Sequence, residues 1–458
     1  MVGTHIHRNI TWAENAKPFM TYLARDSFML QQGLFVADLA YLLNEGSPST
    51  MPIWGAGLTP EPPEGYDYDY VNADVLINRM SVNEEGMLVL PDGMSYRVLV
   101  LPETNRMTVP VLCKIRELII GGATVVGPKP LKSPSLTGYP DADSQVQALA
   151  NDLWGDLDGI SRTKRICGKG IVVWGLPLSE ILASLSVAKD IEYSQPLDSK
   201  LSWIHRRVCD TDIYFIANTT DSPQDIDVRF RVGGKDAELW HPDTGAIRPA
   251  EYKIDNGRTT VQLHLAKRES VFVVFRRATS SASRAMPSQT STILETVAGP
   301  WDVSFPPNLG APEKIQLNKL ESWTENINQG VKYFSGTATY KKMVLVQQSW
   351  FRPGAKIMLS LGIVKDIAEI SINGKALGTL WKEPYQVDVT GILKSGTNQL
   401  KIKVTNEWTN RLVGDRSAPA DKKVLTAGHP MMLGFSGPRP VAESGLIGPV
   451  TLVSVENR

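Results

Sequence analysis

The sequence has few cysteines, no long apolar run and no excess of charge of either sign. Its three cysteines, Cys113, Cys167 and Cys209, are odd in number and have no metal-ligand spacing, so neither a disulfide framework nor a zinc site is indicated. The longest apolar stretches, such as 34–43, are far shorter than the roughly 20 residues of a membrane span. The 48 basic residues balance 48 acidic ones without a Lys/Arg cluster, which argues against nucleic acid or an anionic membrane as a partner.

Short catalytic and nucleotide-binding motifs are also missing. No Gly-x-Gly-x-x-Gly follows a predicted strand and no P-loop is present, so a nucleotide is not the expected ligand. No Gly-x-Ser-x-Gly elbow is present for a serine nucleophile. Met1 is followed by Val-Gly-Thr-His and not by a signal-peptide pattern, which leaves the cytoplasm as the default expectation for localisation.

Flat aromatic rings, in contrast, are plentiful. The chain contains 11 tryptophans and 13 tyrosines. Such rings suit the apolar faces of sugars, although the buried cores of β-sandwiches are the commoner place for them.

The first segment predicts a helix over residues 11–32. Thr11 is the expected N-cap, with Glu14 three residues later as in a capping box, and Gly33 ends the apolar pattern. Residues 2–10 are expected to form a short strand or loop that leads into this helix. A strand and a helix cannot bury both of their faces alone.

Residues 34–196 alternate between strand and helix patterns. Apolar runs at 34–43 and 96–102 are typical of buried parallel strands. Residues 109–122 have helical spacing, with Pro110 suited to the first turn and two glycines to the end. Because a strand, a helix and a strand with short turns form a parallel unit, we interpret this region as a flavodoxin-like α/β domain.

Residues 197–277 change in character. Six short alternating runs separated by turn signals, among them Asp243-Thr244-Gly245, predict an antiparallel β-sandwich. The next segment, 278–298, is small, polar and unpatterned, which predicts a linker or a long loop.

Residues 299–458 form a second all-β set. The Asn373-Gly374 pair between two alternating runs predicts a type I′ hairpin turn, because both central residues of that turn need positive φ. No internal repeat of solenoid or propeller period is present.

This C-terminal set resembles the galactose-binding-like jelly roll of many glycoside hydrolases. The resemblance rests on the runs at 334–342, 359–406 and 410–415, whose order matches as well as their chemistry. It implies a domain that binds sugar, borders the active site of a neighbouring barrel, or braces that barrel. Because functional groups gather near strand ends, the sugar-contact candidates in this domain are Trp381, Asn406, Glu407 and Trp408.

The whole chain resembles the portion of glycoside hydrolase family 106, the α-L-rhamnosidase-like enzymes, that follows the catalytic barrel. The resemblance is carried by residues 3–38, 65–82, 90–103 and 122–130. It implies a barrel-end remnant at 1–33, an amidotransferase-like α/β domain at 34–196, an antiparallel β-sandwich at 197–277, a linker at 278–298 and a jelly roll at 299–458. One departure is Ala13, where the family usually has a second aromatic residue after Trp12.

The same resemblance places the N-terminal residues nearest to a sugar. Residues 2–9 look like the final strand and loop of the barrel, and the C-terminal ends of barrel strands face the active site. This implies sugar contacts from His5, His7, Arg8 and Trp12. Inverting glycosidases also need an acid and a base carboxyl roughly 6.5–9.5 Å apart. In the family both come from the barrel, and neither is assigned to a residue of this chain, since Glu14 is better explained as a helix-start residue.

Three carboxylates gather in the segment 66–74, and calcium prefers such oxygen ligands. However, Asp67 and Asp69 have no Gly-hinged loop of the calcium type, and alternation in a strand would put both on one solvated face. The expectation is therefore no cofactor, with calcium at Asp67, Asp69 and Asp74 as the weaker alternative.

Three hypotheses for function remain open. The first is a truncated α-L-rhamnosidase-like hydrolase whose site is completed by unassigned residues or by a second chain that carries the barrel. The second is a non-catalytic carbohydrate-binding or scaffold protein derived from such an enzyme. The third is a truncated product whose apolar surface around Ile6, Trp12, Phe19 and Phe28 leads to self-association. The expected ligand is a carbohydrate, rhamnose-containing by resemblance.

Overall fold

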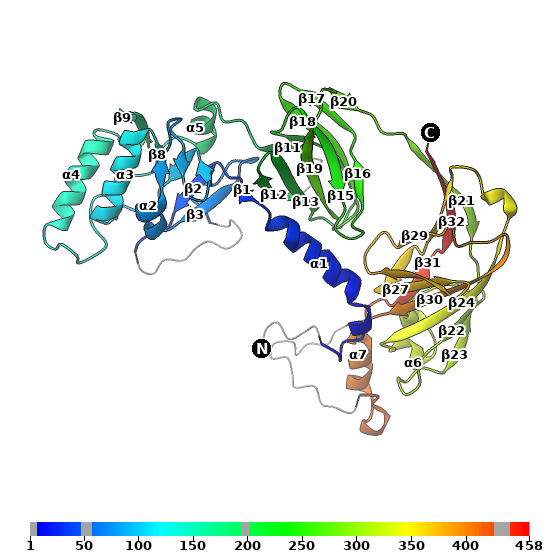
Figure 1. Ribbon diagram of the computed structural model, residues 1–458. Coiled ribbons are helices and arrows are strands. Elements are labelled where there is room, and N and C mark those ends of the chain that lie inside the picture. Colours follow the sequence, from blue (N-terminus) through cyan, green and yellow to red (C-terminus); the bar gives the residue numbers. More distant parts are fainter. Residues whose placement is uncertain (1–6, 47–56, 194–200, 426–439, 458) are drawn as a thin grey trace. The chain divides into compact units, whose positions relative to one another are not determined.

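The computed structural model describes residues 7–46, 57–193, 201–425 and 440–457, in which strands predominate over helices (Figure 1). The chain divides into two compact units: Ser27–Ala285, and Met1–Asp26 together with Met286–Arg458. None of the helices in the described ranges is long and apolar enough to cross a membrane.

A parallel sheet forms the N-terminal part of the unit Ser27–Ala285. Its strand order is β3-β2-β7-β8-β10-β9. The strands are β2 (Leu39–Leu42), β3 (Tyr68–Val71), β7 (Val98–Val100), β8 (Thr124–Val126), β9 (Lys164–Cys167) and β10 (Gly170–Val173). All neighbours are parallel except β9, which is antiparallel to β10. Every residue of β2, β7 and β8 is buried, as expected for strands that are covered on both faces.

Helices cover both faces of this sheet unequally. On one face, α2 (Ala73–Arg79), α3 (Val109–Gly121) and α4 (Ala142–Trp154) share a core with alternate strand residues. On the other face, among the described residues, α5 (Leu178–Ser184) is the one helix whose side chains enter the core. Helix α3 begins beside Pro110 and ends at Gly122, whose φ is 129°, as its sequence predicts. A small sheet of β4 (Ser81–Val82), β5 (Leu88–Val89) and β6 (Ser95–Tyr96) follows α2.

The second part of the same unit is a β-sandwich. One sheet has the order β1-β12-β13-β19-β15-β16 and the other β11-β14-β18-β17-β20. The first sheet contains β1 (Leu34–Phe35), β12 (Leu201–Val208), β13 (Thr211–Asn218), β15 (Lys235–Trp240), β16 (Ile247–Pro249) and β19 (Ser270–Ala278). The second contains β11 (Ile191–Tyr193), β14 (Gln224–Phe230), β17 (Tyr252–Asp255), β18 (Arg258–Leu265) and β20 (Ser283–Arg284).

This pairing corrects the predicted boundary at residue 196. Strands β1 and β11 lie within residues 34–196, yet β1 pairs with β12 and β11 pairs with β14, so both belong to the sandwich. A strand of two or three residues is too short for its sequence to indicate which sheet it joins. Its backbone hydrogen bonds decide that.

Strand β19 is buried on both faces of its sheet. Val271, Val273 and Phe275 belong to the core between the two sheets. Phe272 and Val274 point the other way and pack against Met29, near the end of α1 (Lys17–Leu30). This explains why its sequence is a continuous apolar run and not an alternating one.

A buried ionic network joins the parallel sheet to the sandwich. His205 on β12 is 1% exposed, and its Nδ1 lies 2.8 Å from Asp190 Oδ2 while its Nε2 lies 3.1 Å from Asp212 Oδ1. Arg231, which follows β14, has its Nε 3.4 Å from Asp190 and donates from both terminal nitrogens to Asp38 at 3.1 Å. Because Asp38 directly precedes β2, these charges connect the two parts of the unit.

The network keeps His205 in its charged form. Both ring nitrogens face carboxylates, and only the imidazolium donates from both. Burial works against this charge, but the hydrogen bonds to Asp190 and Asp212 outweigh it and raise the pKa of His205. Burial likewise favours the neutral carboxylic acids, but the bonds from His205 help to hold the pKa of Asp190 and of Asp212 below the usual range. The Tyr214 ring stacks on the imidazole at 3.9 Å between centroids.

The C-terminal part of the chain is built from two sheets that enclose one core. Their orders are β21-β32-β25-β29 and β23-β22-β24-β30-β27-β28. The first contains β21 (Gln289–Thr296), β25 (Lys356–Ser360), β29 (Gln386–Asp388) and β32 (Thr451–Asn457). The second contains β22 (Trp301–Ser304), β23 (Lys314–Leu317), β24 (Thr337–Val346), β27 (Ile367–Ile372), β28 (Lys375–Leu380) and β30 (Gly396–Thr405).

Shorter elements complete this part. They are β26 (Ile363–Lys365), β31 (Gly445–Gly448), α6 (Gln329–Lys332), α7 (Thr409–Ser417) and several 3₁₀ turns. The hairpin between β27 and β28 turns at Asn373 and Gly374, whose φ values of 52° and 82° confirm the predicted positive φ at both positions.

The predicted linker at 278–298 is wrong for about half of its length. Residues 283–284 form β20 and residues 289–296 form β21, which pairs along its length with β32. A polar edge strand needs no apolar alternation, because its backbone supplies the pairing and its side chains face water.

The start of the predicted helix 11–32 also differs. Residues 7–12 form turns, Ala13–Asn15 form a short 3₁₀ helix, and α1 begins only at Lys17. Pro18 explains the later start, because proline is accepted in the first turn of a helix and disfavoured inside one. Thr11 is therefore no N-cap, and its hydroxyl is buried with no hydrogen-bond partner within the described residues.

Candidate functional site

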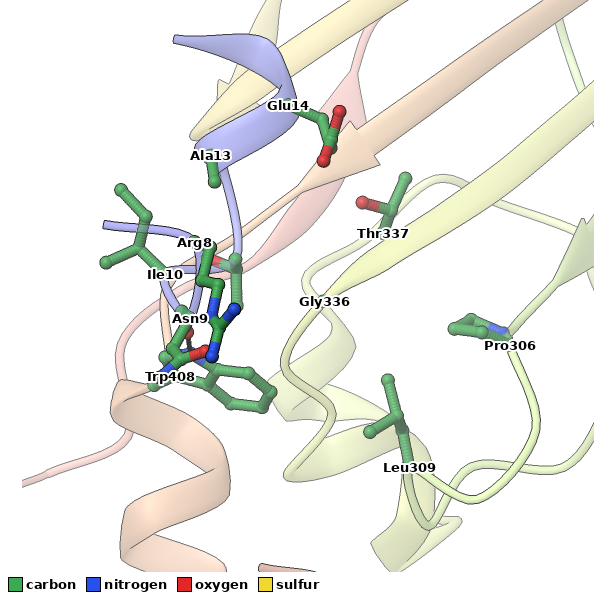
Figure 2. A pocket seen from close by; sticks show the side chains of 11 residues that line it. Arg8, Asn9, Ile10, Ala13, Glu14, Pro306, Leu309, Gly336, Thr337 and Trp408 are labelled. Carbon is green, nitrogen blue, oxygen red and sulfur yellow. Dashed lines mark hydrogen bonds between the residues drawn. The ribbon is translucent and has the colours of Figure 1, made fainter. Parts of the chain in front are cut away.

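An open pocket of about 480 Å³ lies where the N-terminal turns meet loops of the C-terminal sheets (Figure 2). The N-terminal segment supplies one side of it and the loops before β24 and after β30 supply the other. Its lining consists of Arg8, Asn9, Ile10, Thr11, Ala13, Glu14, Pro306, Leu309, Gly336, Thr337 and Trp408.

Local hydrogen bonds fold the N-terminal side. The Ile10 amide donates to the His7 carbonyl at 3.1 Å, and the Ala13 amide donates to the Ile10 carbonyl at 3.3 Å. The Asn9 amide donates to His7 Nδ1 at 3.1 Å, which leaves the ring proton of neutral His7 on Nε2. The short turns direct the side chains of Arg8 and Glu14 toward the pocket, as Figure 2 shows.

Two charged side chains of opposite sign line this space. Arg8 and Glu14 are both exposed, and neither forms an ion pair with another described residue. A guanidinium offers up to five donors and a carboxylate offers acceptors, so together they can bind the hydroxyl groups of a neutral polar ligand. The Trp408 indole adds a flat apolar face beside Arg8 (Figure 2).

The opposite wall is held by buried polar groups. Asn406 is 3% exposed, and its amide bonds to the backbone of Phe334 and Gly336. Thr337 follows this loop, and its hydroxyl lies 2.7 Å from that of Thr405.

A cluster of aromatic rings lies outside the pocket lining. The Trp381 ring centroid is 5.3 Å from that of Phe19 and 5.2 Å from that of Tyr22, and Trp12 lies edge-on to Phe19 at 6.3 Å. These contacts fix the first turns of α1 on the C-terminal sheets, so Trp12 and Trp381 have a packing role here.

The structure thus brings together only part of the predicted sugar-contact set. Arg8 and Trp408 line the pocket, whereas Asn406 lies behind its wall and Glu407 is exposed but outside the lining. His7 is exposed next to the pocket, and His5 lies outside the described residues.

Several residues of the pocket lining are not predicted by the sequence as sugar contacts. The sequence favours Glu14 as a helix-start residue over a catalytic carboxyl, and Leu309 and Thr337 carry no signal. No local pattern could have found them, because they meet Arg8 only through tertiary structure.

The carboxylates considered for calcium do not form a solvated face. Asp69 accepts a hydrogen bond from the Tyr96 hydroxyl at 2.9 Å, and Asp74 accepts one from Asn78 at 2.8 Å. Burial, together with the charges of Asp190 and other nearby carboxylates, raises the pKa of Asp67 to about 7. Across the described ranges, no group of three or more His, Cys, Asp or Glu side chains is arranged to hold a metal ion.

A second place where α/β domains bind ligands is the carboxyl edge of the parallel sheet, at the point where strand order reverses. Here that point lies between β2 and β7. Glu45, which follows β2, accepts the Thr108 amide at 2.9 Å and the Thr108 hydroxyl at 2.7 Å, at the N-terminus of α3. The protein's own carboxylate therefore occupies the position that an anionic ligand would take.

Known glycoside hydrolases match this chain in sequence and in structure. The sequence matches the profile of glycoside hydrolase family 106, described as alpha-L-rhamnosidase, over residues 1–254, and the galactose-binding domain-like profile of glycosyl hydrolase 2 over residues 321–432. The solved structure of a rhamnosidase from Novosphingobium sp. PP1Y is 36% identical with a TM-score of 0.86, and the match covers 99% of this chain and 42% of that one.

A curated relative, a putative beta-glucuronidase from Formosa agariphila, is 27% identical, and the match covers 92% of this chain and 53% of the relative. The chain therefore spans about half the length of the curated relative that it matches. The family 106 profile covers more than half of the 458 residues. The chain belongs to glycoside hydrolase family 106, the α-L-rhamnosidase family, and carries a galactose-binding-like β domain.

Proposed function

We propose that this protein takes part in the hydrolysis of terminal α-L-rhamnosyl or related glycosidic bonds, and that its pocket contacts the sugar. Family membership supports the reaction class. The observation that carries the proposal is the pocket itself, in which an indole ring, a guanidinium and a carboxylate face one open space. Asn9 and Trp408, which are hydrogen-bonded to each other in its lining, are 399 residues apart in the chain.

The chemistry of the lining suits a deoxy sugar. Arg8 donates to and Glu14 accepts from ring hydroxyls, while the Trp408 ring packs on the C–H face of the pyranose. Leu309 and Pro306 form an apolar side of the same pocket, where the methyl group of a 6-deoxy sugar loses less hydration than a hydroxymethyl group would.

A binding role without turnover is the second candidate. Glycoside hydrolysis needs two carboxyl groups that flank the scissile bond. Glu14 is the one carboxylate among the described lining residues. In the hydrolase, the acid and base come from the catalytic barrel of the family, and this chain supplies a wall of the sugar site.

The remaining parts have supporting roles in this proposal. Residues 7–30 correspond to the end of the barrel. The α/β domain is an amidotransferase-like scaffold that binds no nucleotide, a role that the Glu45 contact to α3 supports. A second chain that carries the barrel would complete the site.

The test uses the purified chain, a panel of aryl glycosides led by the α-L-rhamnoside, and calorimetric titration with L-rhamnose. Arg8→Ala and Glu14→Gln should each weaken L-rhamnose binding by about tenfold, the equivalent of one charge-assisted hydrogen bond. Arg352→Ala is the matched control, since Arg352 is 65% exposed and pairs with Glu456 away from the pocket.

Turnover by the purified chain that is lost in the Arg8 variant would show a complete hydrolytic site at this pocket. Binding without turnover supports a sugar-binding wall whose acid and base are not in this pocket, which agrees with the binding role and with a hydrolase whose carboxyl groups come from the barrel. If L-rhamnose neither binds nor reacts, the assignment of the pocket to a sugar is refuted.

A further inference from the structure

The side chain of Asn406 is fully engaged by one loop of the pocket. Its Oδ1 accepts the Gly336 amide at 2.9 Å, and its Nδ2 donates to the Phe334 carbonyl at 2.9 Å. Its own backbone amide donates to the Gly336 carbonyl at 3.3 Å. Three hydrogen bonds from one residue thus fix the loop that precedes β24.

This loop needs such support. Gly336 has a φ of 131°, a conformation that side-chain-bearing residues rarely adopt, and Phe334 is 0% exposed. Without Asn406, a buried carbonyl and a buried amide would lose their partners, which would destabilise this conformation of the loop. Gly336 and Thr337 form part of the pocket wall, so their position decides the shape of the site.

The opposite wall is tied to the same short segment. Trp408 Nε1 donates to the Asn9 carbonyl at 2.7 Å, next to Arg8. Residues 406–408 therefore hold both walls of the pocket: Asn406 holds the Gly336 loop, and Trp408, which Figure 2 shows beside Asn9, holds the N-terminal turns.

We infer that Asn406 is a positioning residue of the sugar pocket, which sets the Gly336 wall from behind, and that the Trp408 N–H positions the Arg8 wall. This replaces the prediction that Asn406 touches the sugar itself. The inference rests on the proposed function for the identity of the ligand, whereas the clamp on the two walls is tested separately by amide exchange.

Asn406→Asp gives a reversible test of the clamp. The aspartate still accepts the Gly336 amide, but as a carboxylate it faces the Phe334 carbonyl without a proton to donate. Protonation restores the donor, and burial moves the carboxyl pKa upward, within reach of mildly acidic buffers. Sugar affinity should therefore be lost at pH 8 and regained near pH 5.

Asn398→Asp is the matched control. Asn398 is 1% exposed on β30, the strand that Asn406 directly follows; it accepts the Lys394 amide at 3.0 Å and donates to the Lys394 carbonyl at 2.6 Å. It lies outside the pocket lining, so its variant undergoes the same chemical change without affecting the walls.

The experiment measures L-rhamnose affinity and amide exchange of the 334–337 segment at pH 5 and pH 8. For Asn406→Asp we expect about tenfold weaker binding at pH 8 with recovery at pH 5, together with faster exchange at pH 8 only. Wild-type protein and Asn398→Asp should show neither change. If the wild type binds no L-rhamnose, the proposed function fails while the exchange data still test the clamp. Unchanged exchange and affinity in Asn406→Asp, or the same pH profile in Asn398→Asp, would overturn the inference.

Trp408→Phe tests the second wall. It keeps an aromatic ring but removes the N–H that holds Asn9. Exchange of the amides at residues 10–13 should rise and L-rhamnose binding should weaken, with little change in the thermal midpoint. Slow exchange at these amides in the variant would show that the N–H does not position the wall.

Discussion

The buried imidazolium at His205 offers the sharpest test of how the unit Ser27–Ala285 is held together. His205→Phe keeps a ring of similar shape against Tyr214 but removes both hydrogen bonds. Asp190 and Asp212 then remain buried, at 1% and 3% exposure, without the cation between them.

The expected loss of stability is large. Removing one partner of a buried ion pair costs about 3–5 kcal/mol, because the remaining charge is left uncompensated. Arg231 still contacts Asp190, and Arg207 still donates to Asp212 at 2.7 Å, so we expect the lower end of that range. His264→Phe is the matched control: His264 and Asp225 form a pair at 2.6 Å whose side chains are 68% and 80% exposed, and such surface pairs contribute little.

The assay is denaturant-dependent amide exchange of the β12–β13 hairpin between pH 5 and pH 9. The pKa of His205 is raised in the folded protein, so its contribution is fully present below the unfolded value near 6.5 and is lost as pH rises through the folded value. Wild-type stability should therefore fall with rising pH above about 6.5, and His205→Phe should lack this decline. A loss below about 1 kcal/mol, or an identical pH slope in the variant, would refute the charged-histidine argument.

Further predictions concern single sites. Asp67→Asn should stabilise the protein above pH 7 by at most about 4 kcal/mol and have no effect near pH 4. Folding raises the pKa of Asp67 to about 7, so the ionised carboxylate destabilises the folded state at higher pH and asparagine removes that cost. Urea unfolding at several pH values measures the difference. Gly374→Ala should lower the free energy of unfolding by about 1–2 kcal/mol through the φ of 82° alone, because the added Cβ meets no atom within 4 Å. Gly391→Ala is the control: its Cβ also meets no atom within 4 Å, but its φ is not positive, so thermal unfolding should be nearly unchanged. Glu45→Ala should cost about 1 kcal/mol, seen as faster amide exchange at the start of α3, because Thr108 loses its acceptor.

Several elements followed directly from local sequence. The buried runs of β2 and β7 and the helix α3 occur where periodicity, Pro110 and the paired glycines predict them. The Asn373-Gly374 turn is equally local, since its residues themselves favour positive φ. Helix α4 was not predicted, although Val146, Ala150 and Leu153 are spaced as a buried helix face.

Other features were beyond local reasoning. The segment 289–296 has no strand pattern of its own and becomes β21 only because β32 offers it a partner. The alternating runs of β12 and β13 gave no sign that His205 would be buried between Asp212 on the neighbouring strand β13 and Asp190, which precedes β11.

By itself the sequence determined the succession of an α/β region and two all-β regions along the chain and the resemblance to family 106, because hydrophobic period and turn chemistry act over a few neighbouring residues. Only the tertiary structure decided which groups share the pocket. Arg8, Glu14, Thr337 and Trp408 meet because the rings around Trp381 and the hydrogen bond from Trp408 to Asn9 hold the N-terminal turns against the C-terminal sheets, and those interactions have no signature in the local sequence.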